Sequence, residues 1–282
     1  MNKSKVYFTD LRAPVGTSQL TKLQRLIRSA GIGEIDMEKK LVAIKLHFGE
    51  PGNLTYLRPN YAKAVADVVK ELGGVPFLTD CNTLYPGRRK NALEHIESAY
   101  ENGFSPFSTG CQVIIGDGLR GNDDVEVPVA GGEYVEKAKI GRAIMDADVF
   151  ISLSHFKGHE MTGFGGALKN IGMGCGGHRG KVEQHSGGKP GGKRKRCAGC
   201  RQCIKQCGQD AISYDGGKAF IDQEKCVGCG RCIAVCNFDA IFNPNDCACE
   251  QLNRKMAEYA KAVVDGRPQF HSSLVIDVSP YC

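Results

Sequence analysis

The sequence predicts an α/β protein with a mostly parallel sheet, helices on both faces, and a small inserted cysteine-rich module. Short apolar runs alternate with amphipathic stretches over the first 155 residues. Because these runs are mostly continuous rather than alternating, they indicate a sheet that is covered on both faces. Two cysteine-rich repeats interrupt the pattern, and an apolar helix and strand follow them. We therefore expect an α/β domain at 1–192, an inserted module at 193–245, and a helix and strand at 246–282 that complete the first domain.

Amphipathic periodicity and capping residues define the expected helices. Thr17 or Ser18 can cap the first helix, and Gly73 can end the second. The expected helices lie at 20–30, 61–72, 91–100, 141–147 and 250–264. The expected strands lie at 5–10, 41–47, 75–79, 111–116, 149–154 and 273–278, and alternation at 123–130 predicts an antiparallel addition.

Eight of the fourteen cysteines lie in two copies of the pattern C-x2-C-x2-C-x3-C, 29 residues apart. The copies are Cys197, Cys200, Cys203 and Cys207, and Cys226, Cys229, Cys232 and Cys236. Thiolates at this spacing hold 4Fe–4S clusters, so the sequence predicts two such clusters and one-electron chemistry. Zinc is the alternative, but two interleaved quartets fit zinc poorly because each ion takes four ligands.

The two copies also match outside their cysteines. Gly199 and Gly228 occupy the same place in each copy, and we expect a Cβ there to crowd the inorganic sulfide of a cluster. The segment resembles a bacterial-type two-cluster ferredoxin. That resemblance implies that the fourth cysteine of each run binds the other cluster, so Cys236 would join the first three cysteines and Cys207 the second three.

One departure from the ferredoxin pattern concerns the residue after each fourth cysteine. The usual residue is proline, which has no N–H, whereas Gly208 and Asn237 stand here. We expect their N–H groups to point at cysteine sulfur and to tune the clusters. Outside the repeats, ordinary thiols are expected at four cysteines, with a third metal site as the alternative. These are Cys175, Cys247, Cys249 and Cys282.

Polar motifs follow three expected strands, at 46–50, 80–85 and 154–160. The carboxyl ends of parallel strands meet at one edge of a sheet, where ligands bind in open α/β folds, so we expect one pocket. The catalytic candidates are His155, Lys157, His159 and Lys169, because such groups can move protons near neutral pH. Glycine lets N–H groups approach an anion, and a helix beginning near residue 166 would point its positive end at it. The anion-binding candidates are therefore Gly163, Gly165 and Gly166, although a flexible connector is an alternative interpretation.

These motifs resemble a known family. The stretches 153–160 and 163–170, together with the ferredoxin-like insert, resemble domain-of-unknown-function family 362, iron–sulfur proteins of bacteria and archaea. The resemblance spans about 46–280 and implies a fold and clusters rather than a substrate. The stretch 165–169 also resembles the lactate racemases, in which a lysine and histidines hold a nickel-pincer nucleotide. The matching residues are Gly165, Gly166, Lys169, His155, His159 and either His178 or His185, with one residue more before the lysine here.

Charge and hydropathy indicate the compartment and the partners. The net charge is +6, and seven basic residues without an acidic one lie between Lys189 and Lys205. This run is either a solvated linker or a docking surface for an anionic partner, and no nucleic-acid motif accompanies it. The N-terminus lacks a signal peptide, no run is long enough to span a membrane, and cluster thiolates need a reducing compartment. We expect a cytoplasmic protein of anaerobic metabolism.

The sequence therefore predicts an iron–sulfur electron-transfer protein that exchanges electrons with a redox partner protein or a small anionic substrate. The alternative is a redox enzyme acting on an anionic or phosphate-bearing substrate or cofactor at the glycine-rich loop. The motifs specify neither the substrate, the direction of the electrons nor the oligomeric state. The chain ends directly after an expected strand, which favours a chain shortened after Cys282.

Overall fold

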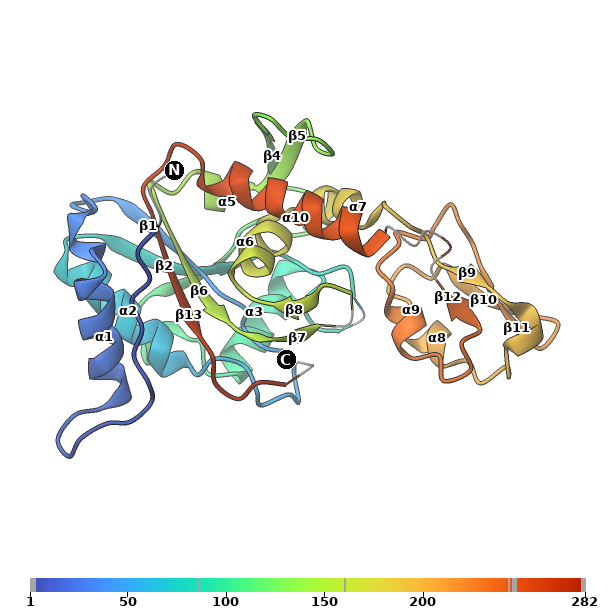
Figure 1. Cartoon of the computed structure of the whole chain (residues 1–282), viewed down its shortest axis with the longest axis horizontal. Coiled ribbons are helices and arrows are strands. Elements are labelled where there is room, and N and C mark those ends of the chain that lie inside the picture. Colours follow the sequence, from blue (N-terminus) through green and yellow to red (C-terminus); the bar gives the residue numbers. More distant parts are fainter. Residues whose placement is uncertain (1–3, 86, 160, 243, 245–247, 280–282) are drawn as a thin grey trace.

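The protein is built on one parallel sheet. The computed structural model describes residues 4–279 apart from 86, 160, 243 and 245–247 (Figure 1). The five sheet strands run parallel in the order β13-β6-β1-β2-β3. They are β1 (Leu41–Lys45), β2 (Val75–Asp80), β3 (Gln112–Ile115), β6 (Val149–His155) and β13 (Gln269–Leu274). The predicted α/β class with a mostly parallel sheet is confirmed.

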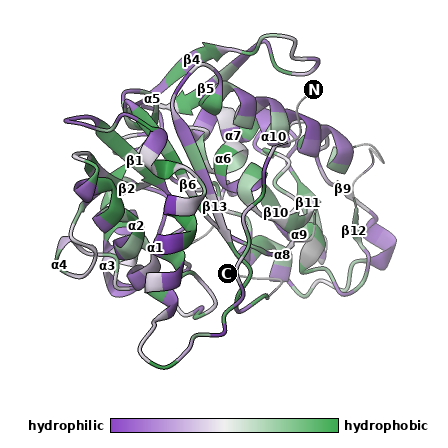
Figure 2. Cartoon of the chain, turned by 60° about the vertical axis from the view of Figure 1, so that its left-hand side comes forward, coloured by the Kyte–Doolittle hydropathy of each residue, from purple (hydrophilic) through white to green (hydrophobic). Residues whose placement is uncertain are grey.

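Helices cover both faces of this sheet because successive strand residues point to opposite sides. Val42 and Ile44 of β1 join one apolar core, and Ala43 between them joins the other. The first core includes residues of α1 (Gln19–Ser29), α2 (Pro59–Glu71) and α3 (Ala92–Glu101). The second includes residues of α5 (Arg142–Met145), α6 (Ala167–Cys175) and α10 (Ala248–Val264). Figure 2 shows hydrophobic residues concentrated on the strands between these layers.

Smaller elements complete this part of the chain. They are η1 (Ile32–Glu34), α4 (Pro106–Thr109), β4 (Asp124–Pro128), β5 (Lys137–Gly141), β7 (Lys157–His159), β8 (Gly163–Gly165) and α7 (His178–His185). The pairs β4–β5 and β7–β8 are antiparallel ribbons. No helix among the described residues combines the length and the apolar character needed to cross a bilayer.

Three sequence expectations about strands are wrong. Residues 5–10 form no strand, and Val6 and Phe8 are 90% and 86% exposed, so this segment has no core to pack against. The expected antiparallel strand at 123–130 does form, as β4, but it pairs only with β5 in a separate two-stranded sheet and is not added to the central sheet. The last strand lies earlier than 273–278, because Gln269 pairs with Phe150 and sets the register with β6.

The cysteine-rich segment, defined here as residues 191–242, forms a small lobe beside the sheet (Figure 1). Its elements are β9 (Gly191–Gly192), η2 (Arg194–Arg196), α8 (Gln202–Lys205), β10 (Ile212–Asp215), β11 (Lys218–Ile221), α9 (Arg231–Ala234) and β12 (Ile241–Phe242). Strand β9 pairs with β12, and β10 pairs with β11. The expected boundaries at 193 and 245 stay a prediction.

Candidate functional site

A cavity of about 310 Å³ lies at the carboxyl edge of the central sheet. His47 follows β1, Asp80 ends β2 and His155 ends β6, and all three side chains line this cavity. The three polar motifs therefore meet in one place, as expected from parallel strands. Its volume is suitable for a small organic ligand.

The floor of the cavity is a buried network of paired charges. Lys45 Nζ lies 2.9 Å from Asp80 Oδ1, and the two side chains are only 1% and 5% exposed. Arg89 contacts both Asp80, at 3.5 Å, and Glu50. Burial raises the pKa of Asp80, but the neighbouring charges, chiefly that of Lys45, outweigh burial and hold it well below its ordinary value. Two cations and two carboxylates thus balance, and the floor is neutral overall.

Asn170 fixes the position of Lys45. Its Oδ1 accepts a hydrogen bond of 2.8 Å from Lys45 Nζ, and its Nδ2 donates to Lys45 O at 3.1 Å. The neighbouring Gly174 is required by the same lysine, because a Cβ there would lie 2.5 Å from Nζ. Helix α6 is therefore locked against β1 at the base of the cavity.

The walls of the cavity carry an excess of positive charge. The lining contains six basic side chains and two carboxylates, so four positive charges remain after pairing, with histidines counted as neutral. The Lys157 side chain lines the cavity and forms no hydrogen bond or ion pair with the described residues. A cavity with this balance attracts anions. The basic side chains are Lys45, Arg89, Lys157, Lys169, Lys181 and Arg231.

His159 and Lys169 form a close pair at this wall. His159 Nε2 and Lys169 Nζ lie 2.6 Å apart, which is a hydrogen bond between two bases. His159 Nδ1 accepts from the main-chain N–H groups of Met161 at 3.2 Å and Thr162 at 3.3 Å, which hold the ring in place. Such a pair can exchange a proton with a ligand in the cavity.

The other cavity histidines lie in different surroundings. His155 Nε2 lies 2.6 Å from Ile276 O. Burial, together with the nearby charges of Lys169 and His159, lowers the pKa of His185 to about 3. Its Nδ1 is buried and has no hydrogen-bond partner among the described residues. His185 is therefore a neutral group with an unused polar atom in the lining of the cavity.

The glycine-rich stretch is an ordered part of the site, and the connector interpretation is wrong for its described residues. It forms β7, β8, α6 and α7. Gly165 and Gly166 line the cavity, and a Cβ at Gly165 would lie 3.4 Å from Lys169 Cδ and 3.5 Å from Lys157 Cγ. Gly163 is exposed and does not line the cavity. Gly166 precedes α6 as expected, and anion binding by this loop stays a prediction.

A second hollow lies in the cysteine-rich segment, and four cysteines line it. These are Cys197, Cys200, Cys203 and Cys236, which we call the outer quartet. This grouping takes its fourth cysteine from the other repeat, as the ferredoxin resemblance implies. The remaining four, called the inner quartet, also lie near one another, since the charges of Cys207, Cys226 and Cys229 all raise the pKa of the Cys232 thiol, as does that of Cys203 in the outer quartet. The inner quartet is Cys207, Cys226, Cys229 and Cys232.

The surroundings of both quartets fit iron–sulfur clusters. Main-chain N–H groups donate to cysteine sulfur in both, from Ala219 to Cys197 at 3.4 Å and Ala240 to Cys236 at 3.3 Å in the outer quartet, and from Ala211 to Cys207 at 3.3 Å in the inner quartet. No three ligand-type side chains in the described part of the chain converge to hold one metal ion. A cluster of four irons is bound by four cysteines spread around it and needs no such convergence on a single ion.

One expectation about residues next to the cysteines needs correction. The N–H groups that donate to the fourth cysteines belong to Ala211, at 3.3 Å, and Ala240, not to Gly208 and Asn237. The turn after each cysteine brings the N–H four residues later back to its sulfur. The matched glycines, at 199 and 228, have positive φ, and a Cβ would lie within 2.6 Å of a backbone carbonyl oxygen. Main-chain packing therefore favours these glycines, and crowding of inorganic sulfide stays a prediction.

The cysteines outside the quartets carry no metal-binding signature in the described residues. Cys175 is buried, which raises its pKa to about 12, and Cys249 is exposed. Cys247 and Cys282 lie outside the described residues.

Sequence reasoning missed several cavity residues, above all Lys45, Arg89, Lys181 and Arg231. A lysine inside an apolar strand, such as Lys45, is a usable signal, because a buried ammonium must be paired. Arg231 carries a second signal, since it stands between Cys229 and Cys232.

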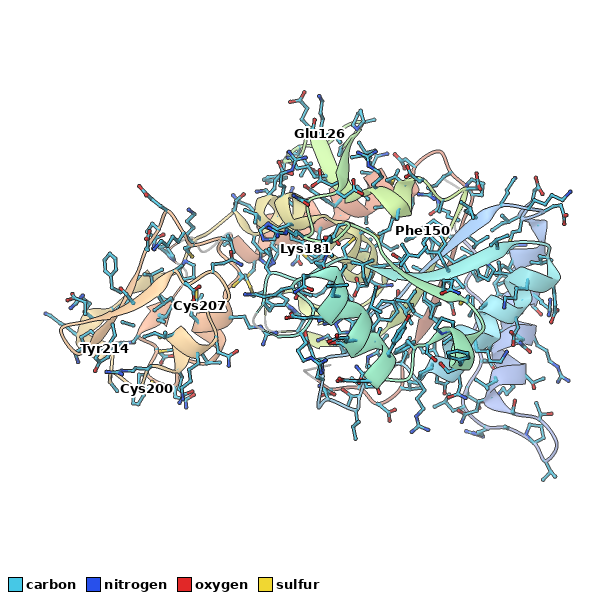
Figure 3. All side chains as sticks on the ribbon, turned by 180° about the vertical axis from the view of Figure 1, so that it is seen from behind. Glu126, Phe150, Lys181, Cys200, Cys207 and Tyr214 are labelled. Atoms are coloured by element: carbon cyan, nitrogen blue, oxygen red, sulfur yellow. The ribbon has the colours of Figure 1, made fainter. Side chains whose placement is uncertain are left out.

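The inner quartet borders the cavity. The guanidinium of Arg231 lies 4.6 Å from the centre of the Tyr85 ring, and both residues line the cavity. The main chain at Gly228 packs against the His185 carbonyl, where a Cβ would lie only 2.5 Å away. Figure 3 shows Cys207 on the part of the lobe nearest Lys181, with Cys200 and Tyr214 farther along it.

The fold and the site define an α/β protein with a cationic cavity and two adjoining cysteine quartets. The family model described as domain of unknown function (DUF362) matches residues 42–282, and the chain belongs to this family.

The chain is also similar to individual proteins. It is 27% identical over 168 residues to the thylakoid-associated protein sll1697 of Synechocystis sp., a match that covers 56% of this chain and 46% of that protein. It is similar to the lactate racemase apoprotein from Thermoanaerobacterium thermosaccharolyticum, with 14% identity, a TM-score of 0.40, and coverage of 62% of this chain and 37% of that one. For a crystal structure of a Thermotoga maritima protein, the identity is 15%, the TM-score 0.46, and the coverage 91% and 50%. The chain thus spans half the length of these relatives or less.

Proposed function

We propose that this protein is an iron–sulfur electron-transfer protein in which each quartet binds one 4Fe–4S cluster. Residues 193–245 would then be a ferredoxin-like module inserted in the α/β domain. When bound, the clusters supply one-electron transfer to or from a ligand in the cavity. The observation that carries the proposal is that Arg231, which stands between Cys229 and Cys232 of the inner quartet, lines the cationic cavity.

The residues of the cavity would bind and orient an anionic ligand. Lys157 offers an ammonium group that forms no ion pair within the described residues, and Lys169 lies beside it across Gly165. The neutral floor of paired charges holds the shape of the site without competing for the anion. The His159–Lys169 pair would take up or release the proton that accompanies a change in ligand charge.

A redox enzyme is the second candidate, and the proton-exchanging groups favour it. A protein that only carries electrons needs neither the 2.6 Å pair of His159 and Lys169 nor the unused Nδ1 of His185 in its cavity. For a nickel-pincer cofactor of the racemase type, Lys169 and the histidines at 155, 159 and 185 would be the holding residues, and all line the cavity. His178 does not.

The exposed basic run at 193–196 supports docking of a redox partner protein next to the outer quartet. We place the protein in the cytoplasm, since cysteines that bind clusters need a reducing compartment.

Anion binding to anaerobically purified protein tests the proposal. Malonate, a small dianion, is titrated calorimetrically into wild-type protein and into Lys157→Met and Lys169→Met variants. Each variant should bind malonate about tenfold more weakly, because one charge-assisted contact is lost, with unchanged iron and sulfide content. Lys63→Met, on the exposed side of α2, is the matched control and should bind as wild type.

Two results would overturn the proposal: protein without iron and sulfide, or malonate affinity that is the same in all four proteins. Native mass spectrometry of the same sample distinguishes the two candidates, because a co-purified organic or nickel cofactor would identify the enzyme.

A further inference from the structure

Each cysteine quartet has an arginine stacked on a tyrosine, but the two pairs lie in different surroundings. Arg201 lies 4.0 Å from the centre of the Tyr214 ring, and both are exposed at the hollow of the outer quartet. Arg231 lies 4.6 Å from the centre of the Tyr85 ring, and both line the cationic cavity. The first arginine faces solvent, whereas the second faces the ligand site.

Arg231 is placed between the inner quartet and the cavity. The residue is half-buried, and its guanidinium forms no hydrogen bond or ion pair with the described residues, so its donors are available to a ligand. Arg231 stands between two inner-quartet cysteines, Cys229 and Cys232, at the start of the short helix α9 that carries Cys232. The same cation is therefore near an inner-quartet sulfur and in the lining of the anion site.

We propose that the cavity is a site for small dianions, such as dicarboxylates, that is negatively coupled to reduction of the inner cluster, with Arg231 as the cation that serves both. This inference rests on the proposed function, because it requires a cluster at the inner quartet. A dianion beside Arg231 repels an electron added to that cluster. Reduction of the cluster repels the dianion to the same extent, because coupling between two sites is reciprocal.

Arg231 stabilises both the reduced inner cluster and the bound dianion. Its positive charge stabilises the reduced, more negative cluster and also stabilises the bound dianion. Loss of this charge should therefore lower both the potential of the inner cluster and the affinity for the dianion. Arg201 should influence only the outer cluster, because it does not line the cavity.

The coupling makes the inner cluster a stronger reductant when the cavity is filled. Couplings between protein sites are typically 5- to 150-fold in affinity, and we expect about tenfold here. For a one-electron couple, tenfold corresponds to a shift of about 59 mV. Saturating ligand should thus lower one of the two potentials by about this amount and leave the other nearly unchanged.

The test is anaerobic voltammetry of the cluster-loaded protein with and without saturating malonate, combined with calorimetric malonate affinities of oxidised and dithionite-reduced protein. Arg231→Gln should lower the malonate-sensitive potential and weaken malonate binding about tenfold. Arg201→Gln, the matched control, should lower only the other potential and keep its malonate affinity within about twofold. Arg231→Lys keeps the charge and should retain both properties of the wild type.

Two outcomes would overturn the inference. In the first, the protein contains both clusters and binds malonate, but neither potential changes with malonate and the malonate affinity is the same in both oxidation states. The other is Arg231→Gln and Arg201→Gln weakening malonate binding equally. The wild-type measurements test the inference even if a variant does not bind its clusters. Absence of both clusters would instead refute the proposed function itself.

Discussion

Asp80 is the residue whose loss we expect to cost the most stability. Its side chain is 5% exposed and faces Lys45 at 2.9 Å and Arg89 at 3.5 Å. In Asp80→Asn, Arg89 still contacts Glu50, but Lys45 keeps only neutral partners, Asn170 Oδ1 and Leu46 O, among the described residues. Breaking a buried pair in this way costs about 3–5 kcal/mol, a large part of the 5–15 kcal/mol that typically stabilises a domain.

Urea unfolding followed by far-ultraviolet circular dichroism measures this cost, since the chain has no tryptophan. At a slope of about 2–3 kcal/mol per molar urea, the midpoint should fall by about 1–2.5 M. Asp67→Ala removes a comparable pair, to Lys63 at 2.8 Å, that is exposed, and should cost only about 0.5 kcal/mol. The double variant Lys45→Met/Asp80→Leu should recover part of the loss, because no unpaired ammonium remains. Equal costs for Asp80→Asn and Asp67→Ala would refute the account of the cavity floor.

Three further predictions concern pH, packing and the cluster environment. Burial lowers the pKa of both His95 and His185 to about 3. The unfolded chain therefore binds more protons than the folded chain between pH 6.5 and 3. The free energy of unfolding should decrease as the pH is lowered through this window, by up to about 1.4 kcal/mol per pH unit for each histidine. His95→Leu should flatten the slope measured by urea unfolding between pH 7 and 5.5, and an unchanged slope would contradict the assignment. A Cβ at Gly172 would lie 2.0 Å from Met256 O. The variant Gly172→Ala should therefore lower the free energy of unfolding by about 1–3 kcal/mol, because it separates α6 from α10. The control Gly33→Ala should cost much less, because a Cβ there would lie 3.9 Å from its nearest neighbour. Ala211→Pro removes the N–H that donates to Cys207 and should lower a cluster potential measured by voltammetry. Gly208→Pro should leave both potentials unchanged. A lower potential in Gly208→Pro but not in Ala211→Pro would restore the expectation drawn from the sequence.

The strands and helices that are packed on the sheet could be predicted from the sequence because their patterns reflect burial directly. The apolar run that forms β1 and the periodicity of α2 are examples. The segment at 5–10 has the same apolar and aromatic composition as a strand, yet it is exposed, because a strand also needs a neighbour with a free edge. Composition alone does not say which segment finds that edge.

The candidate site could also be predicted only in part. Strand-end motifs located the cavity, because parallel strands bring their carboxyl ends together without any knowledge of side chains. Contacts between side chains that are far apart in the sequence could not be predicted. Lys45 is fixed by Asp80 and Asn170, and Arg231 stacks on Tyr85, which is 146 residues earlier. These pairs depend on how helices and the cysteine-rich segment pack on the sheet, and local patterns do not encode that packing.

Iron and acid-labile sulfide analysis of anaerobically purified protein tests the central claim most directly. Two quartets, each closed by a cysteine from the other repeat, predict eight irons and eight sulfides per chain. The variant Cys207→Ser, which changes one inner-quartet cysteine, should reduce loading of the inner cluster and spare the outer one. Stoichiometric zinc without labile sulfide would contradict the account.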